Sequence, residues 1–145
     1  MKSEFYTASP EETEAVGREL AEAVSKRERA FIAMRGEMGV GKTAFVRGFA
    51  SYFGISGVKS PTYTVVNEYR SASGVSIYHF DMYRITDGDN LYSIGYDDYI
   101  EARGYSVAEW SENVEEFLPD DAVFVTISRT DFSSGRKIEI VGLDK

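Results

Sequence analysis

The sequence predicts an α/β domain whose mixed central sheet of about seven strands is flanked by helices in three layers. A short apolar run that ends in a glycine, residues 29–36, is typical of a buried strand. A glycine-rich loop follows it, and residues 42–53 then carry apolar side chains at helical spacing. Runs rich in valine, isoleucine, threonine and tyrosine supply further strands. The 145 residues have the size of one domain, so we expect a single domain over residues 1–145.

The composition excludes several kinds of site and of partner. The chain has no cysteine and one histidine, which excludes disulfides, thiolate zinc sites and histidine-rich metal sites. No stretch reaches the roughly 18 apolar residues that a membrane span needs, and residues 1–14 lack the apolar centre of a secretory signal. We therefore expect a cytoplasmic protein without a membrane partner. The net charge of −8 argues against tight direct binding to a nucleic acid, because such binding depends on neutralising phosphates. It leaves open a basic protein partner; the alternative is that the acidity only keeps the domain soluble.

The first helix is predicted to begin near Pro10. Ser9, Pro10 and Glu12 fit the N-cap, the first helical position and the reciprocal position of a capping box. The apolar residues that follow, as far as Val24, recur at helical spacing. Thr13 lies on the same helical face, one turn before the first of these apolar residues.

The middle of the chain predicts a hairpin, two short helical segments and a strand. Two runs rich in β-branched and aromatic residues flank "RSASG", residues 70–74, which is typical of a β-hairpin. The stretches 87–95 and 97–104 predict short helices or turns. A brief strand, residues 105–110, follows them.

The last part of the chain predicts a helix and a second pair of strands. Either Ser111 or Asn113 fits the cap of a helix that runs to Leu118, where a proline stops it. Two apolar runs around the turn "TDFSSGR" then predict strands over residues 122–129 and 137–143.

The glycine-rich loop carries a complete phosphate-binding pattern. Gly36, Gly41, Lys42 and Thr43 satisfy G-x-x-x-x-G-K-[ST] between the predicted strand and helix. Glycines let the backbone turn its N–H groups inward, and these groups hold phosphates together with the positive end of the following helix. The lysine reaches the β- and γ-phosphates, and the threonine hydroxyl can ligate Mg²⁺. We therefore expect a P-loop NTPase-like domain; the alternative is a tight glycine turn with a solvated lysine.

The lack of a guanine-recognition motif indicates which nucleotide base is bound. GTP-binding proteins commonly read guanine through Asn-Lys-x-Asp or Thr-Lys-x-Asp, and the chain contains no Asn-Lys or Thr-Lys pair. ATP is therefore favoured over GTP.

Two acidic residues end apolar strands and could complete a phosphate site. Asp81 closes residues 75–81, and Glu109 closes the strand before Trp110. Chemistry on this scaffold needs an acid to hold Mg²⁺ and a group to orient the attacking water. Strand alternation places His79 on the same face as Asp81. We expect at least one carboxylate to serve the phosphate loop; the alternative is that both are solvated strand ends.

Four motifs resemble a known family in their order and spacing. These are "GEMGVGKT", "SPTYTVVNEY", "HFDMYRI" and "EWSE". They are similar to those of the bacterial TsaE (YjeE-type) family, the ATPases of tRNA threonylcarbamoyladenosine biosynthesis, and the resemblance extends over residues 13–136. Met82 stands where leucine is usual, which is a volume-conserving change. Ser111 stands where proline is common, which predicts a looser entry to the next helix.

The resemblance implies a set of site residues. The Mg²⁺ ligands correspond to Thr43 and Glu109. Residues 60–64 correspond to a switch-like loop. The catalytic residues correspond to Lys42, Thr62, Asp81 and Glu109. The residues that bind ATP correspond to Thr13 near the base, Gly36, Glu37, Met38, Gly39, Val40, Gly41, Lys42, Thr43, Ala44, Asp81 and Arg136.

The resemblance also implies an activity and partners. The protein is expected to hydrolyse ATP slowly with Mg²⁺ and to couple hydrolysis to the TsaB–TsaD pair, which installs threonylcarbamoyl on adenosine 37 of tRNAs reading ANN codons. It is expected to act without tight tRNA binding of its own and to be a monomer when isolated. One rival interpretation is a small-molecule P-loop kinase, but we find no long insertion that would form its lid. The other is a non-catalytic nucleotide sensor, which requires Asp81 and Glu109 to be dispensable.

Several side chains have structural alternatives. Thr13 could be a polar residue in a first helical turn, and Trp110 a core residue instead of a nucleotide contact. His79 could be a half-buried strand histidine or could orient Asp81. The tyrosines expected to pack the hairpin are Tyr63, Tyr69, Tyr78 and Tyr83. An arginine finger or phosphate contact could come from Arg84, Arg103 or Arg136.

Overall fold

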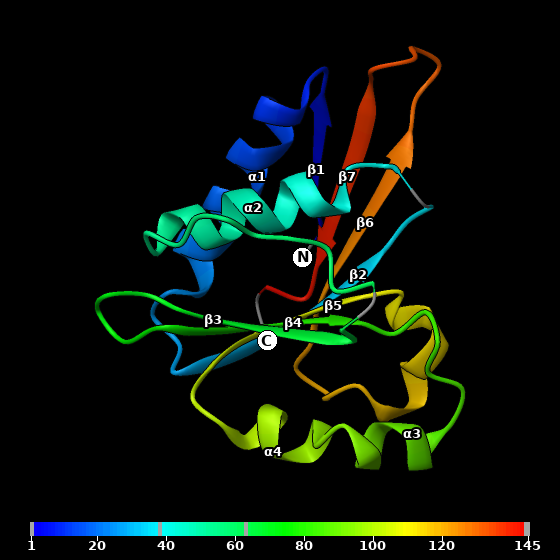
Figure 1. Ribbon diagram of the computed structural model, residues 1–145. Helices are drawn as coiled ribbons and strands as arrows, with labels where there is room; N and C mark the ends of the chain where they lie inside the picture. Colours follow the sequence, from blue (N-terminus) through cyan, green and yellow to red (C-terminus); the bar gives the residue numbers. More distant parts are fainter. Residues whose placement is uncertain (1, 38, 63, 144–145) are drawn as a thin grey trace.

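A mixed seven-stranded sheet forms the centre of the computed structural model, which describes residues 2–37, 39–62 and 64–143 (Figure 1). The order across the sheet is β1-β7-β6-β2-β5-β4-β3. The strands are β1 Lys2–Thr7, β2 Arg29–Arg35, β3 Val66–Arg70, β4 Ser76–Asp81, β5 Gly104–Glu109, β6 Val123–Arg129 and β7 Arg136–Val141. The predicted α/β class and mixed sheet are confirmed.

The pairing pattern places parallel strands in the middle of the sheet and hairpins at its edges. Strand β2 runs parallel to β5 and β6, and β4 runs parallel to β5. The pairs β3–β4, β6–β7 and β1–β7 are antiparallel. The predicted hairpin around residues 70–74 is confirmed, and the two strands predicted around the later turn pair as β6 and β7. The sequence analysis did not predict β1, an edge strand that pairs with β7.

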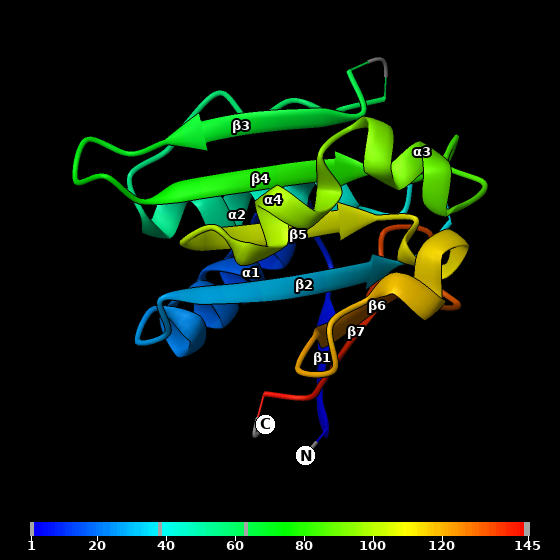
Figure 2. The same ribbon diagram turned by 90° about the horizontal axis from the view of Figure 1, so that it is seen from below.

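Helices cover both faces of the sheet and give the predicted three layers (Figure 2). The two longer helices, α1 (Pro10–Val24) and α2 (Lys42–Tyr52), lie on one face. Two short helices, α3 (Gly88–Ser93) and α4 (Tyr96–Glu101), cover the other face together with the 3₁₀ helix η1 (Ser111–Phe117). The short helices predicted over the middle of the chain are therefore confirmed.

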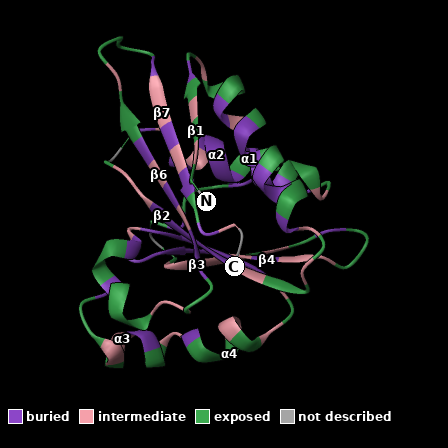
Figure 3. Cartoon of the chain, turned by 180° about the vertical axis from the view of Figure 1, so that it is seen from behind, coloured by how far each residue is buried: buried purple, intermediate pink, exposed green. Residues whose placement is uncertain are grey.

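Alternation along β2 divides the core into two clusters. Ile32 and Met34 belong to the cluster that contains the apolar faces of α1 and α2. Phe31 and Ala33 belong to the cluster beneath α3, α4 and η1. Figure 3 shows the resulting buried centre of the sheet. Because β2 is buried on both faces, its sequence reads as one apolar run.

The helix ends agree with the sequence analysis at α1 and differ at η1. Ser9 caps α1, because its Oγ accepts a hydrogen bond of 3.2 Å from the Glu12 N–H. The reciprocal bond is displaced by one residue, since the Glu12 carboxylate accepts from the Ala8 N–H at 2.9 Å. At η1 the predicted cap by Ser111 or Asn113 is wrong: Trp110 occupies the cap position and makes no capping side-chain hydrogen bond.

Ser111 and Asn113 instead tie η1 to the rest of the fold. The fully buried Ser111 hydroxyl donates to the Met34 carbonyl of β2 at 3.0 Å. The Asn113 amide donates to the carbonyls of Met82 and Tyr83 at 3.0 and 3.2 Å. The expectation of a looser helix entry at Ser111 is therefore wrong, because these bonds fix the start of η1.

Two glycines let α1 and α2 pack at close range. A Cβ on Gly17 of α1 would lie 2.2 Å from the Phe45 carbonyl oxygen, and a Cβ on Gly48 of α2 would lie 2.0 Å from the Glu14 carbonyl oxygen. Each glycine therefore admits the backbone of the other helix. This contact supports α2, which begins at the glycine-rich loop.

Replacing Gly17 or Gly48 with alanine is expected to lower the free energy of unfolding by about 1–3 kcal/mol, because the added methyl group forces the two helices apart. Denaturant titration of each variant measures this change. Glu19→Ala, on the exposed face of α1, is the control and should stay within about 0.5 kcal/mol of the parent. Unchanged stability in both glycine variants would contradict the close packing.

Candidate nucleotide-binding site

The glycine-rich loop connects the carboxyl end of β2 to the start of α2. Gly36 and Gly41 have φ angles of +153° and +117°, a region that L side chains rarely adopt. A Cβ on Gly36 would also lie 2.7 Å from the Ile127 carbonyl oxygen. Gly41 caps α2 without a side-chain hydrogen bond, so the first N–H groups of this helix are available to an anion.

A cavity of about 550 Å³ lies in front of this loop. It opens at the carboxyl ends of the parallel strands β4 and β5, where open α/β sheets bind their ligands. Its walls come from the glycine-rich loop, from the segment before β3 and from the ends of β4 and β5. They are formed by Gly39, Gly41, Lys42, Thr43, Ser60, Thr62, Val65, Asp81, Tyr83, Arg84, Glu109 and Trp110.

The two predicted acids lie side by side in this cavity. Asp81 is the last residue of β4 and pairs in register with Glu109, the last residue of β5. Both are buried, with exposed fractions of 8% and 5%. Both lie on the face of the sheet that α2 covers. Every second residue of a strand points to the same face, and Ile77 of β4 and Val107 of β5 belong to the core cluster that contains the apolar faces of α1 and α2.

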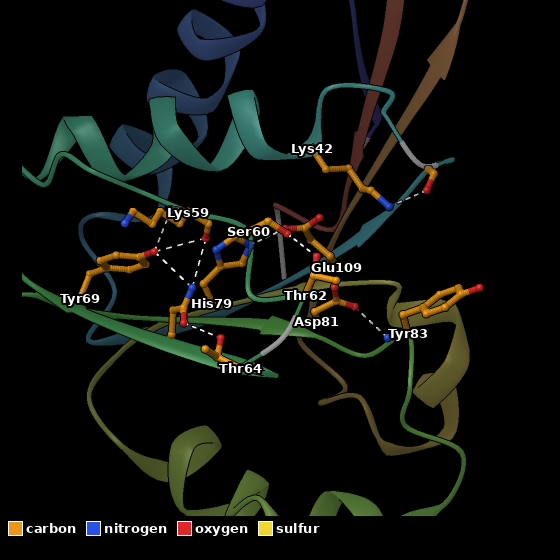
Figure 4. Close-up of polar contacts among 12 residues, drawn as sticks. Lys42, Lys59, Ser60, Thr62, Thr64, Tyr69, His79, Asp81, Tyr83 and Glu109 are labelled. Atoms are coloured by element: carbon orange, nitrogen blue, oxygen red, sulfur yellow. Dashed lines mark hydrogen bonds and ion pairs between the residues drawn. The ribbon is translucent and has the colours of Figure 1, made fainter.

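Lys42 extends from the first turn of α2 into the same space. Its ammonium donates a hydrogen bond of 2.7 Å to the Gly36 carbonyl oxygen (Figure 4). Burial lowers the pKa of Lys42, while the nearby charges of Glu109, Glu112 and Asp81 act in the opposite direction and raise it. The site therefore holds one buried cation close to two buried carboxylates.

Trp110 completes the environment of this cation. The Lys42 ammonium lies 4.1 Å from the centroid of the indole ring, within the range of a cation–π interaction. Trp110 follows Glu109 in a left-handed conformation, with a φ of 57°, which is uncommon for a large side chain. Tyr83 packs against the indole ring, with centroids 5.0 Å apart and the ring planes tilted by 58°. Trp110 thus packs against the core cluster and also lines the cavity.

His79 contacts Glu109. The imidazole is fully buried, and its Nε2 lies 2.5 Å from Glu109 Oε2. The carboxylate of Asp81 has a different partner, since its Oδ1 accepts a hydrogen bond of 2.9 Å from the Tyr83 N–H. The two predictions for His79, a half-buried strand residue or a group that orients Asp81, are therefore both wrong.

The segment before β3 lies against the acids. The hydroxyls of Ser60 and Thr62, 2.7 Å apart, both line the cavity. The segment is attached to β4 by the Asp81 N–H, which donates to the Val65 carbonyl oxygen at 2.8 Å. Val65 has a φ of 70°, a strained conformation for a β-branched residue. Tyr63, which was expected to pack the hairpin, lies outside the described residues.

The profile of a protein family matches this chain. The family is described as threonylcarbamoyl adenosine biosynthesis protein TsaE, and residues 7–138 match it. The chain belongs to the TsaE family. Among its relatives, the TsaE protein of Haemophilus influenzae is 40% identical over 129 residues, which cover 86% of this chain and 80% of the relative. The TsaE protein of Bacillus subtilis is 36% identical over 126 residues, covering 86% and 77%.

A solved structure resembles this TsaE-family chain in fold. The crystal structure of YdiB from Bacillus subtilis superposes with a TM-score of 0.77 at 30% sequence identity. The match covers 97% of this chain and 84% of the YdiB chain. In the described part of the present chain, none of the helices is long and apolar enough to cross a membrane.

Several residues expected to bind ATP lie behind the loop of this TsaE-family chain. Thr13 is buried, its hydroxyl is 2.9 Å from that of Thr7, and its methyl group lies 3.9 Å from where a Cβ of Gly41 would be. The Arg136 guanidinium donates to the Val40 carbonyl oxygen at 2.7 Å and so fixes the loop from outside. These contacts shape the loop.

The remaining loop positions differ in their surroundings. Glu37 lies beside Gly36 in a separate hollow of about 430 Å³. Val40 and Ala44 are buried with their side chains away from solvent. Met38 lies outside the described residues.

Only some of the arginines and tyrosines considered in the sequence analysis lie at the cavity. Arg84 lines the cavity, whereas Arg103 forms an ion pair of 3.1 Å with Glu28 in another part of the surface. Tyr69 bonds to Lys59 and Tyr78 packs on Tyr99. Tyr83 packs on Trp110 at the cavity in a tilted arrangement, so the prediction that it packs the hairpin is wrong. Tyr83 and Val65 line the cavity but were not predicted as site residues. Tyr83 lies two residues after Asp81, and Val65 directly follows the 60–64 loop. This closeness in the sequence could have identified both as site residues.

The donor set suits Mg²⁺. The Thr43 hydroxyl and the Glu109 carboxylate both line the cavity. Hydroxyl and carboxylate oxygens are the ligands this ion prefers, and it is commonly held by few protein groups together with phosphate oxygens. The residues present therefore fit the ion beside a nucleotide on the loop.

Proposed function

We propose that the chain binds ATP with Mg²⁺ in this cavity and hydrolyses it in the service of tRNA threonylcarbamoyladenosine biosynthesis. The observation that carries the proposal is one cavity into which the glycine-rich loop, Lys42 and two buried strand-end carboxylates, Asp81 and Glu109, all project. The pathway is that for which the family is described.

In the proposed site, backbone N–H groups of the loop and of the first turn of α2 bind the phosphates. Lys42 exchanges its hydrogen bond to Gly36 for the β- and γ-phosphate oxygens. Thr43 and Glu109 would hold Mg²⁺, which when bound neutralises charge on the phosphate oxygens. Asp81 lies beside Glu109, where its carboxylate can orient a water molecule or contact the γ-phosphate.

The proposed partners are the TsaB and TsaD proteins. We propose that the bound nucleotide controls binding to these proteins through the 60–64 loop. Thr62 lines the cavity and its segment is bonded to the backbone of Asp81, so a γ-phosphate can change the order of this loop.

The charge distribution supports a role through proteins and not through tRNA. Residues 87–121, which form α3, α4, β5 and η1, contain eleven aspartate and glutamate residues, of which all but the buried Glu109 are exposed, and one arginine. An acidic surface of this kind repels phosphate backbones and suits a basic protein surface.

The coupling is tested by measuring how nucleotides change partner binding. The ATP-bound protein is expected to bind the TsaB–TsaD pair more tightly than the ADP-bound form, and binding is expected to raise ATP turnover. Thr62→Ala should reduce both effects while leaving nucleotide affinity close to that of the parent. Ser134→Ala, an exposed hydroxyl in the turn between β6 and β7, is the control.

Calorimetric titration with each nucleotide, beside a phosphate-release assay, measures both effects. Equal affinity for the partner pair in all nucleotide states, with unchanged turnover, would contradict the coupling. A parallel titration of the isolated protein with tRNA at physiological salt should show weak or no binding.

A further inference from the structure

We propose that His79 is a positioning residue that limits Glu109 to a one-oxygen contact with the bound cation and thereby makes the site prefer Mg²⁺ to Ca²⁺. The inference rests on the proposed function, because it assigns a ligand selectivity to the same site.

The position of His79 follows from the sheet register. His79 of β4 pairs with Val107 of β5, and Glu109 is the next residue along β5 on the same face. A diagonal neighbour across two strands is within reach of a long side chain. The contact of 2.5 Å between His79 Nε2 and Glu109 Oε2 spans this diagonal, with the imidazole fully buried.

The hydrogen-bond pattern of the ring indicates where its proton lies. Nδ1 is buried and has no hydrogen-bond partner in the part of the chain that the structure describes. A proton on Nδ1 would leave a buried donor unmatched, which is costly. A proton on Nε2 donates to the Glu109 carboxylate and leaves only a bare acceptor at Nδ1. His79 therefore acts as a fixed donor to one carboxylate oxygen.

The hydrogen bond from His79 determines which carboxylate oxygen of Glu109 is free to bind a cation. The bond from His79 occupies Oε2 and withdraws charge from it, and no other side-chain hydrogen bond to Glu109 is found among residues 2–37, 39–62 and 64–143. Oε1 is then the stronger ligand. Mg²⁺ accepts single carboxylate oxygens in a strict octahedron, whereas Ca²⁺ takes six to eight oxygens and readily uses both oxygens of one carboxylate. A Glu109 held in this way favours the smaller ion.

The test compares substitutions that remove the donor with one that keeps it. His79→Leu removes it, and His79→Asn, which is too short to reach Glu109, removes it while keeping a polar group. His79→Gln places an amide N–H at a similar reach to Nε2. The readout is the affinity of each protein, loaded with a non-hydrolysable ATP analogue, for Mg²⁺ and for Ca²⁺ by calorimetry, with the analogue alone as the blank.

The parent protein and His79→Gln are expected to prefer Mg²⁺. His79→Leu and His79→Asn are expected to lose about 10-fold or more of their Mg²⁺ affinity, as is typical when a group that orients a ligand is removed, with Ca²⁺ affinity equal or higher. Affinity for the metal-free analogue should not change. A purely structural role for His79 predicts lower thermal stability with an unchanged Mg²⁺-to-Ca²⁺ ratio.

The outcomes separate the two proposals. A parent protein that binds the analogue with Mg²⁺, together with an unchanged ion ratio in the soluble variants that lack the donor, would overturn the role of His79 alone. A parent protein with no metal-dependent binding of the analogue would overturn the proposed function and this inference with it.

Discussion

Lys42→Ala is expected to weaken ATP binding and to reduce hydrolysis by at least about 10²-fold, because removing a preorganised donor from a phosphate site costs that much or more. The ammonium of Lys42 is held beside Gly36 and over the ring of Trp110. No other lysine lines the cavity among the residues that the structure describes. Arg84, the other cationic residue among the described residues of the lining, is exposed, so the buried charge of Lys42 has no equivalent there.

Calorimetry with ATP and a phosphate-release assay measure the two effects of Lys42→Ala separately. Lys26→Ala, an exposed lysine in the turn after α1, is the matched control and should bind and hydrolyse ATP as the parent does. Turnover in Lys42→Ala equal to that of the parent would exclude the glycine-rich loop as the phosphate site.

Glu109→Gln is expected to reduce Mg²⁺-dependent hydrolysis by on the order of 10²-fold or more, because a neutral amide holds the cation less strongly at the phosphates. The fold should persist. Glutamine has nearly the same shape, and its amide oxygen can still accept the hydrogen bond from His79. Asp81→Asn is expected to lose activity as well.

The phosphate-release assay at saturating Mg²⁺ and ATP, with thermal unfolding in parallel, separates lost chemistry from lost folding in Glu109→Gln. Glu116→Gln makes the same chemical change at an exposed position of η1 and should have no effect. If Glu109→Gln and Asp81→Asn both hydrolyse ATP at the rate of the parent, the acids are ordinary strand ends, and the non-catalytic sensor becomes the better interpretation.

The parts of the candidate site that the sequence predicts are those with a local signal, either a short motif or the end of an apolar strand. Gly36, Gly41, Lys42 and Thr43 form one short sequence motif, and the positive φ angles of the two glycines are a local property of the backbone. Asp81 and Glu109 could be selected because each ends an apolar strand, and parallel neighbours bring their carboxyl ends together.

The parts that the sequence does not predict depend on contacts between distant segments. The partner of His79 is set by the register of β4 against β5, which a single strand pattern does not contain. Trp110 itself has a left-handed backbone conformation, and its ring lies against the Lys42 ammonium. Neither feature is visible in the sequence pattern. Strand β1 was not predicted because it is an edge strand in which exposed residues alternate with partly buried ones, so it lacks an apolar run.

The central claim, that this chain hydrolyses ATP, is tested most directly by following the γ-phosphate in water labelled with ¹⁸O. The purified protein is incubated with Mg²⁺ and ATP and without any acceptor, beside Lys42→Ala purified in the same way as the control for contaminating activity. We expect inorganic phosphate that carries one oxygen from water, formed slowly by the parent protein and far more slowly by Lys42→Ala. Phosphate that forms equally in both preparations, or a γ-phosphate that leaves ATP only when a small-molecule acceptor is added, would contradict this claim.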